Sequence, residues 1–141
     1  MTDWHKRLAR LSQYARLTSP DPACPVASAL YTPYGTFMHV DCNRLPRGMN
    51  AMPAQWLDVE WKLRHVLHAE QACLSGHRGD VKGWTMLLTK YPCHHCAQHL
   101  TERGIGELIC PPYRMDTKWL ESHQVATGML LQAGIKITEI I

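Results

Sequence analysis

The sequence predicts an α/β fold in which helices cover both faces of a mixed five-stranded sheet. Segments with helical periodicity alternate with short apolar runs, in the order of one helix, two strands and then three helix–strand pairs. Strands separated by helices pair in parallel through right-handed crossovers, whereas strands joined by a tight turn pair antiparallel. The predicted architecture is therefore a three-layer α/β/α domain with one antiparallel hairpin.

The first third of the chain predicts a helix and this hairpin. Apolar residues recur at intervals of three and four over residues 3–17, where Thr2 or Asp3 can cap a helix, and a Ser-Pro-Asp-Pro segment then ends it. Two runs of β-forming residues flank a Pro-Tyr-Gly turn and predict strands over residues 26–32 and 36–42. We expect these two strands to pair with each other.

The rest of the chain predicts a loop followed by the helix–strand pairs. Residues 43–60 contain two prolines and no clear period, so we expect a loop with at most one helical turn. Glycine or proline follows most of the later apolar segments and marks their ends. The expected helices cover residues 68–76, 93–103 and 117–133, and the expected strands cover residues 84–89, 107–110 and 135–141.

Length and composition limit the classes of protein that the chain can belong to. A chain of 141 residues has room for one domain, and we expect residues 1–141 to form it. The net charge is +3 and no run of Lys or Arg exceeds two, which gives little support for a nucleic-acid partner. No apolar run approaches the ~18 residues of a membrane span, and the N-terminus lacks a signal peptide's apolar core. We therefore expect a cytoplasmic protein whose six cysteines stay reduced.

Two short motifs carry the clearest chemical signal. H-A-E at residues 68–70 and P-C-H-H-C at residues 92–96 each stand where a predicted helix begins. Cysteines three residues apart share one helix face, so Cys93 and Cys96 can bind the same ion, and a helix N-terminus favours their thiolates. Together with His68 they make three ligands for one Zn²⁺ per chain. The fourth coordination position is then open, as in catalytic zinc sites.

Glu70 is the candidate for proton transfer at this site. It lies two residues after His68. A carboxylate in this place can take a proton from a zinc-bound water, whose pKa the ion lowers toward ~7, and pass it to a leaving group. Such a pair suits attack on an amidine-like carbon with loss of ammonia. H-x-E followed by P-C-x-x-C is also the signature of the zinc nucleobase deaminases.

The same motifs allow two interpretations without hydrolytic activity. Cys93 and Cys96 could form a redox pair, which a reversible disulfide without zinc would indicate. The zinc could instead be a closed structural site in a binding module, which a fourth protein ligand would indicate. The candidates for that fourth ligand are Cys73, Cys110, His94, His95 and His99.

Three further segments resemble the deoxycytidylate (dCMP) deaminases, which belong to the zinc-dependent cytidine deaminase superfamily. S-P-D-P-A-C-P-V at residues 19–26 resembles their S-x-D-P-x-x-x-V segment. N-R-L-P-R-G at residues 43–48 resembles their Y-N-G-x-P-R-G loop, and W-K-L at residues 61–63 resembles the stretch that leads into their metal motif. The resemblance extends over residues 4–114.

The resemblance implies a reaction and several roles. The reaction is hydrolytic deamination of dCMP, or of a 5-substituted dCMP, to the corresponding deoxyuridine monophosphate and ammonia. Glu70 is implied as the catalytic residue beside the same three zinc ligands. The backbone N–H of Ala69 would face the pyrimidine carbonyl, and Asn43 would bind the 3′-hydroxyl of the sugar. A homo-oligomer such as a hexamer is implied, with Mg²⁺ only if nucleoside triphosphate effectors bind.

A monophosphate substrate needs cationic groups or hydrogen-bond donors at the mouth of the pocket. Arginine binds phosphate through a fork of donors, although each arginine could equally be a solvated surface charge. Tyr113 could cover the substrate or pack against the sheet. The sequence departs from the family near the sugar, with D-C-N for G-Y-N at residues 41–43, Arg44 for glycine and V-A-S for V-G-A at residues 26–28. A free nucleoside or base, or tRNA, is therefore the alternative substrate. The candidate phosphate contacts are Arg47, Arg44, Ser19 and Arg114.

Overall fold

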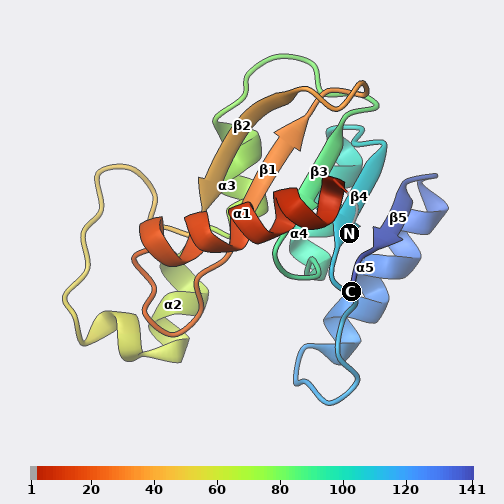
Figure 1. Cartoon of the computed structure of the whole chain (residues 1–141). Coiled ribbons are helices and arrows are strands. Elements are labelled where there is room, and N and C mark those ends of the chain that lie inside the picture. Colours follow the sequence, from red (N-terminus) through yellow and green to blue (C-terminus); the bar gives the residue numbers. More distant parts are fainter. Residues whose placement is uncertain (1–2) are drawn as a thin grey trace.

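The computed structural model describes residues 3–141 and contains one five-stranded mixed sheet (Figure 1). Its strands are Ala27–Tyr31 (β1), Phe37–Cys42 (β2), Thr85–Leu88 (β3), Glu107–Cys110 (β4) and Lys136–Glu139 (β5). The helices are Asp3–Thr18 (α1), Val59–His65 (α2), Ala69–Ser75 (α3), His94–Glu102 (α4) and Leu120–Gln132 (α5), with a 3₁₀ turn at Gln55–Leu57 (η1).

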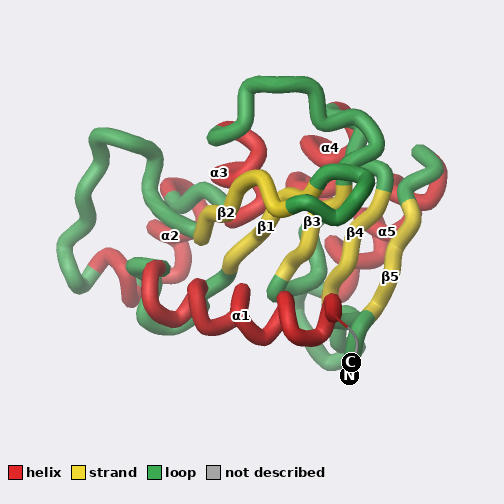
Figure 2. Tube along the Cα trace, turned by 45° about the horizontal axis from the view of Figure 1, so that its top comes forward, coloured by secondary structure: helices red, strands yellow, loops and turns green. Residues whose placement is uncertain are grey.

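The strand order is β2-β1-β3-β4-β5, so the chain passes over β1 between β2 and β3. β1 is antiparallel to both of its neighbours, whereas β3, β4 and β5 run parallel to one another. α1 lies on one face of this sheet, and α3, α4 and α5 lie on the other (Figure 2). The predicted three-layer α/β/α architecture and its antiparallel hairpin are confirmed.

The alternation of side chains along the strands builds a separate core on each face. In β3, Met86 and Leu88 pack with residues of α3, α4 and α5, whereas Leu87 packs with residues of α1. Successive side chains of a strand point to opposite faces, so a fully buried strand is apolar throughout. This is why the short apolar run at residues 84–89 predicted a buried strand.

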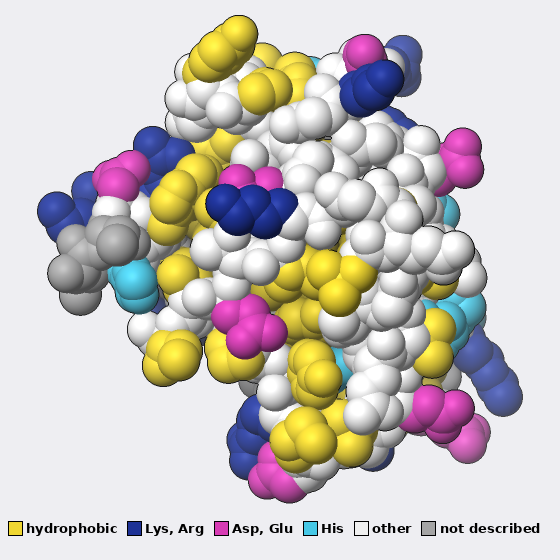
Figure 3. Space-filling view, turned by 90° about the vertical axis from the view of Figure 1, so that its right-hand side faces the viewer, with side chains coloured by type: hydrophobic (Ala, Val, Ile, Leu, Met, Phe, Trp, Pro, Cys, Tyr) yellow, Lys and Arg dark blue, Asp and Glu magenta, His cyan; other side chains and the backbone are white. Residues whose placement is uncertain are grey.

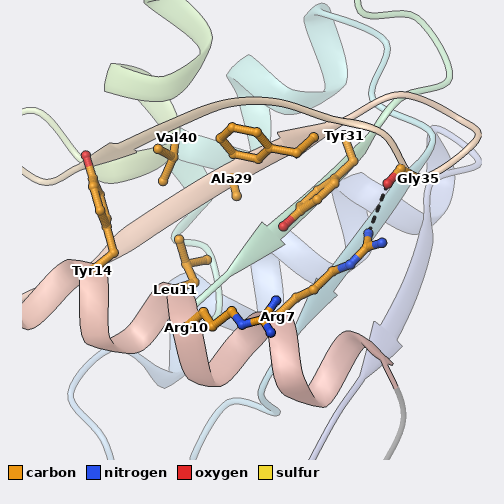
Figure 4. Close-up of a pocket in the computed structure, with 9 residues that line it drawn as sticks. Arg7, Arg10, Leu11, Tyr14, Ala29, Tyr31, Gly35 and Val40 are labelled. Carbon is orange, nitrogen blue, oxygen red and sulfur yellow. Dashed lines mark hydrogen bonds between the residues drawn. The ribbon is translucent and has the colours of Figure 1, made fainter.

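A cavity of about 370 Å³ lies on the α1 face, between α1 and the β1–β2 hairpin (Figure 4). Apolar and aromatic side chains such as Leu11, Tyr14 and Tyr31 line it, and Arg7 donates a hydrogen bond to the carbonyl of Gly35 at 3.1 Å across its rim. The sheet separates this cavity from α3 and α4. None of the residues predicted to form the active site lines it.

The segment predicted as a loop contains structure that its periodicity did not reveal. η1 is the single helical turn expected within residues 43–60, but α2 begins inside that range and continues to His65, so the prediction was incomplete there. α2 has no buried residue, and Asp58 caps it by accepting a hydrogen bond from the amide of Trp61 at 3.1 Å. The last helix begins at Leu120, three residues later than expected. Thr2, one of the two proposed caps of α1, lies outside the described residues.

Replacing Leu130 by alanine tests the larger core. Leu130 is fully buried between α5 and the sheet, and the loss of a buried leucine side chain typically costs about 2–5 kcal/mol. Leu131, which follows it on the same helix, is 59% exposed and provides the matched control. We expect urea unfolding to show a loss of this size for Leu130→Ala and less than about 1 kcal/mol for Leu131→Ala. Equal effects would contradict the position assigned to α5.

Candidate metal centre

Two helix N-termini bring the three predicted ligands together. His68 is the residue before α3, in extended backbone conformation, and its amide donates a hydrogen bond to the side chain of Gln71. Cys93 has the same place and conformation before α4, and Cys96 lies one turn further along that helix. β1 and β3 are antiparallel, and Ser28 near the start of β1 pairs with Leu88, the last residue of β3. The chain continues from Leu88 into α4, so the start of α4 lies near the start of β1.

The spacing of these side chains fits a zinc ion. The Nδ1 atom of His68 lies 3.2 Å from the sulfur of Cys96 and 3.4 Å from the sulfur of Cys93. All three donor atoms lie within 4.8 Å of one another. Tetrahedral zinc, at ~2.3 Å from sulfur and ~2.1 Å from nitrogen, would hold such atoms about 3.6 Å apart. One imidazole and two thiols at this spacing are a donor set for one Zn²⁺.

The protonation states of the three side chains depend on one another. Hydrogen bonds from Cys96 and His68 lower the pKa of the Cys93 thiol to about 3, against the opposing effect of burial. The pKa of Cys96 is raised, because its thiol donates to Cys93 and is buried. The pKa of His68 is raised mainly by its hydrogen bond to Cys93. Both sulfurs can therefore be thiolates together only beside a positive charge, which bound zinc provides.

No other histidine, cysteine or acidic residue among residues 3–141 joins the group, so a zinc ion held by these three side chains would keep an open coordination position. Three of the candidate fourth ligands have other surroundings. His94 hydrogen-bonds to the hydroxyl of Ser122 through Nδ1 at 2.8 Å, Cys73 is buried near the carbonyl of His39, and Cys110 is buried in the core under α4 and α5. The geometry therefore does not favour a closed structural site.

Glu70 lies in the first turn of α3 and is only 5% exposed. Burial raises its pKa, and a hydrogen bond with the Cys96 side chain acts in the opposite direction. The buried hydroxyl of Ser28 on β1 donates a weak hydrogen bond to Oε1 of Glu70 at 3.4 Å. Ser28 was not among the predicted site residues, although it is one of the departures from the V-G-A segment. That departure was the signal that could have identified it.

Asn43 lies directly after β2, and its side chain makes three hydrogen bonds within the chain. Its Nδ2 donates to the carbonyl of Cys24 at 2.9 Å. Its Oδ1 accepts hydrogen bonds from the amide of Val26 at 3.0 Å and from the hydroxyl of Ser19 at 2.6 Å. The segment of residues 19–26, which we call the 19–26 loop, is therefore attached to the end of β2 through Asn43.

The three arginines predicted to bind the phosphate differ in whether their guanidinium groups already form ion pairs within the protein. Arg44 forms an ion pair with Asp41 at 3.2 Å, so two of the departures from the family pattern contact each other. Arg114 forms an exposed ion pair with Asp116 at 2.8 Å. Arg47 is exposed and makes no ion pair or side-chain hydrogen bond within residues 3–141. Of the three arginines, it has the guanidinium most available to a ligand.

Two further residues were predicted to contact the substrate, namely Ala69 and Tyr113. Ala69 lies next to the metal-binding group, and Tyr113 packs against the core. Ala69 is fully buried at the start of α3, between His68 and Glu70. Tyr113 packs edge to face against Tyr91, with ring centroids 4.9 Å apart. This packing agrees with the interpretation that Tyr113 supports the core.

Comparisons with known proteins agree with these observations. A relative from Aliivibrio fischeri, named as an uncharacterized deaminase in the luxG 3′ region, is 29% identical over 98% of this chain and 94% of its own length. The deoxycytidylate deaminase of Mus musculus is 24% identical over 92% of this chain and 74% of its own length. The dCMP deaminase of cyanophage S-TIM5, in a structure with dCMP and dUMP, superposes with a TM-score of 0.70 over 99% of both chains at 16% identity.

The family described as the cytidine and deoxycytidylate deaminase zinc-binding region matches residues 2–111. This range covers most of the chain and includes both metal motifs. The match agrees with the spacing of the three zinc-binding side chains and with the buried carboxyl group beside them. The chain therefore belongs to the cytidine and deoxycytidylate deaminase family, and it is a zinc-dependent deaminase.

Proposed function

We propose that this deaminase converts dCMP, or a 5-substituted dCMP, to the corresponding deoxyuridine monophosphate and ammonia. The observation that carries the proposal is the buried carboxyl group of Glu70 beside the His68, Cys93 and Cys96 group. The similarity to deoxycytidylate deaminases over nearly the whole chain supports the choice of substrate. So does the structural similarity to the cyanophage enzyme that binds dCMP and dUMP.

In this proposal His68, Cys93 and Cys96 hold the zinc, and Glu70 transfers the protons. Bound zinc acts as a Lewis acid that lowers the pKa of water toward ~7 and so provides a nucleophile at neutral pH. A carboxylate oxygen of Glu70 accepts the proton of the attacking water and passes it to N3 of the pyrimidine. Glu70 then takes the remaining proton of the hydroxyl group that is now attached to C4 and delivers it to the amine, which leaves as ammonia while the C4 carbonyl forms. The raised pKa of Glu70, which results from burial, suits a group that must hold a proton between these steps.

Other groups orient the nucleotide. The backbone N–H of Ala69 donates to the pyrimidine carbonyl in this proposal. An amide side chain has two N–H donors, and Asn43 uses one of them on the carbonyl of Cys24. The second can reach the 3′-hydroxyl of the sugar. Arg47 provides an unpaired guanidinium for the phosphate, with Ser19, Arg44 and Arg114 as the remaining candidates, and Tyr113 remains a candidate for covering the substrate.

The charge distribution on one face of the molecule gives no support for a nucleic-acid substrate. On the face shown in Figure 3, Lys and Arg side chains are interspersed with Asp and Glu and do not form a broad basic patch. A nucleic-acid substrate would require a continuous basic surface for the phosphate backbone.

Ammonia release from a panel of cytosine compounds tests the substrate class. The panel contains dCMP, 5-methyl-dCMP, 5-hydroxymethyl-dCMP, CMP, dCTP, deoxycytidine and cytosine. We expect turnover to be confined to the deoxynucleoside monophosphates, and their ranking to reveal the preference at C5. Turnover of deoxycytidine as fast as dCMP would contradict a phosphate requirement.

Replacing Arg47 by alanine tests how the phosphate is bound. We expect kcat/KM for dCMP to fall by about 10- to 100-fold, because a charge-assisted hydrogen bond is worth roughly 1.5–3 kcal/mol. Any slow turnover of deoxycytidine, which has no phosphate, should not change. Arg78 is also exposed, and it lies in the loop after α3, so Arg78→Ala is the matched control. An equal loss for both compounds in Arg47→Ala would exclude Arg47 as the phosphate contact.

We also propose that the chain forms a homo-oligomer. Large apolar side chains are exposed on and beside η1 and α2, and a second copy could cover them. Sedimentation equilibrium would test this, and a monomer at micromolar concentration would contradict it. The most exposed of these side chains are Met52, Leu57, Val59 and Leu63.

A further inference from the structure

An ion pair joins α2 to the 19–26 loop. The Nζ atom of Lys62 lies 3.2 Å from each carboxylate oxygen of Asp21. The side chains of Lys62 and Asp21 are only 16% and 6% exposed, which is unusual for charged residues. α2 itself has no buried residue, and this ion pair connects the helix directly to the 19–26 loop.

Asp21 organises the backbone of the 19–26 loop. Its Oδ1 accepts hydrogen bonds from the amides of Ala23 at 3.0 Å and Cys24 at 3.2 Å, in addition to the one from Lys62. A carboxylate with two amide donors and one ammonium donor makes a strong, directional arrangement. The conformation of the loop therefore depends on a buried negative charge that Lys62 neutralises.

The same loop determines the position of Asn43. Cys24, whose amide is bound by Asp21, accepts a hydrogen bond from Nδ2 of Asn43 through its carbonyl. The hydroxyl of Ser19 donates to Oδ1 of Asn43 and accepts a hydrogen bond from the amide of Asp21. An unbroken series of contacts thus connects Lys62 on α2 with Asn43 at the end of β2.

We propose that Lys62 is a positioning residue for the nucleotide site. Its charge holds Asp21 in the conformation that orders the 19–26 loop, and the ordered loop orients the amide of Asn43 toward the sugar. The inference rests on the proposed function, because it takes Asn43 as a substrate contact. Without Lys62, Asp21 is a buried, uncompensated charge, and the loop must rearrange to hydrate it. The zinc-binding group belongs to α3 and α4 and takes no part in these contacts.

The kinetic test replaces Lys62 by methionine, which keeps an unbranched side chain one atom shorter and removes the charge. We expect KM for dCMP to rise about tenfold or more, with kcat within about threefold of wild type, because binding is weakened and proton transfer is not. Lys62→Arg should restore most of the affinity. The control is Lys82→Met, since Lys82 is exposed on the loop before β3. An unchanged KM, or a fall in kcat alone, would overturn the proposal.

A double variant separates positioning from a loss of fold. Asp21→Asn removes the charge that Lys62 neutralises, so Lys62→Met should raise KM less in that background than in wild type. Equal effects in the two backgrounds would show that Lys62 does not act through Asp21. The double variant buries no unpaired charge, so it also provides a stable protein if Lys62→Met alone unfolds.

Alkylation of Cys24 gives a readout that needs no substrate. Cys24 is partly exposed in the 19–26 loop, whereas the other five cysteines are buried. We expect iodoacetamide to modify Cys24 about tenfold faster in Lys62→Met than in wild type or Lys82→Met, as measured by mass spectrometry of the peptide. An unchanged rate would overturn the role of Lys62 in ordering the loop. If no cytosine nucleotide is turned over, the proposed function fails, but the alkylation result still decides the role of Lys62.

Discussion

Glu70→Gln is expected to lower kcat for dCMP by a factor of about 10²–10⁴, with zinc content unchanged. Glutamine has nearly the same shape, and its side-chain carbonyl can still accept a hydrogen bond from Ser28. It cannot take a proton from water or deliver one to the pyrimidine. Because Glu70 is buried, no bulk water can easily replace it as the proton carrier.

A control and a zinc measurement make this result interpretable. Glu102 is exposed at the end of α4, so Glu102→Gln removes an acidic group without touching the site. We expect Glu102→Gln to retain wild-type activity. If Glu70→Gln retained full zinc and turned over at the wild-type rate, the proton-transfer role would be wrong. If it lost zinc, Glu70 would instead support the metal.

Cys93→Ala is expected to abolish zinc binding and activity together. Two ligands hold zinc far more weakly than three, because the half-buried imidazole of His68 and the thiol of Cys96 are then the only protein ligands left in the group. Ligand binding stabilises the folded state by mass action, so the melting temperature should fall and should no longer respond to a zinc chelator. Zinc analysis by mass spectrometry and thermal unfolding with and without chelator measure both effects.

Cys110→Ala is the matched control for this variant. Cys110 is also buried, but it lies at the end of β4 and outside the metal-binding group. We expect it to retain one zinc per chain and to lose only the stability that follows from a small cavity. Loss of zinc in Cys110→Ala would identify a fourth protein ligand and favour a structural site.

The metal motifs could be predicted because their information is local. Cys93 and Cys96 share a helix face through their spacing alone, and a helix N-terminus favours thiolates wherever the helix lies. His68 and Cys93 are 25 positions apart in the sequence, and this separation does not predict that they lie side by side in the structure. Their juxtaposition depends on the sheet, which places the starts of α3 and α4 together.

α2 and the pairing of the arginines could not be predicted in the same way. α2 has no buried residue, so it produces no clear hydrophobic period, and one of its contacts with the protein is an ion pair between residues 41 positions apart. Arg44 could have pointed toward the substrate, but its guanidinium is paired with Asp41. Such pairings depend on side-chain directions at the end of β2, which a sequence pattern does not specify.

Ammonia release from dCMP by the zinc-loaded protein tests the proposed reaction most directly, with zinc, protein and dUMP quantified in the same sample. We expect one zinc per chain, one ammonia for each dUMP formed, and loss of turnover after chelation that added zinc restores. A folded preparation with one tightly held zinc per chain that releases no ammonia from dCMP would contradict the proposed activity.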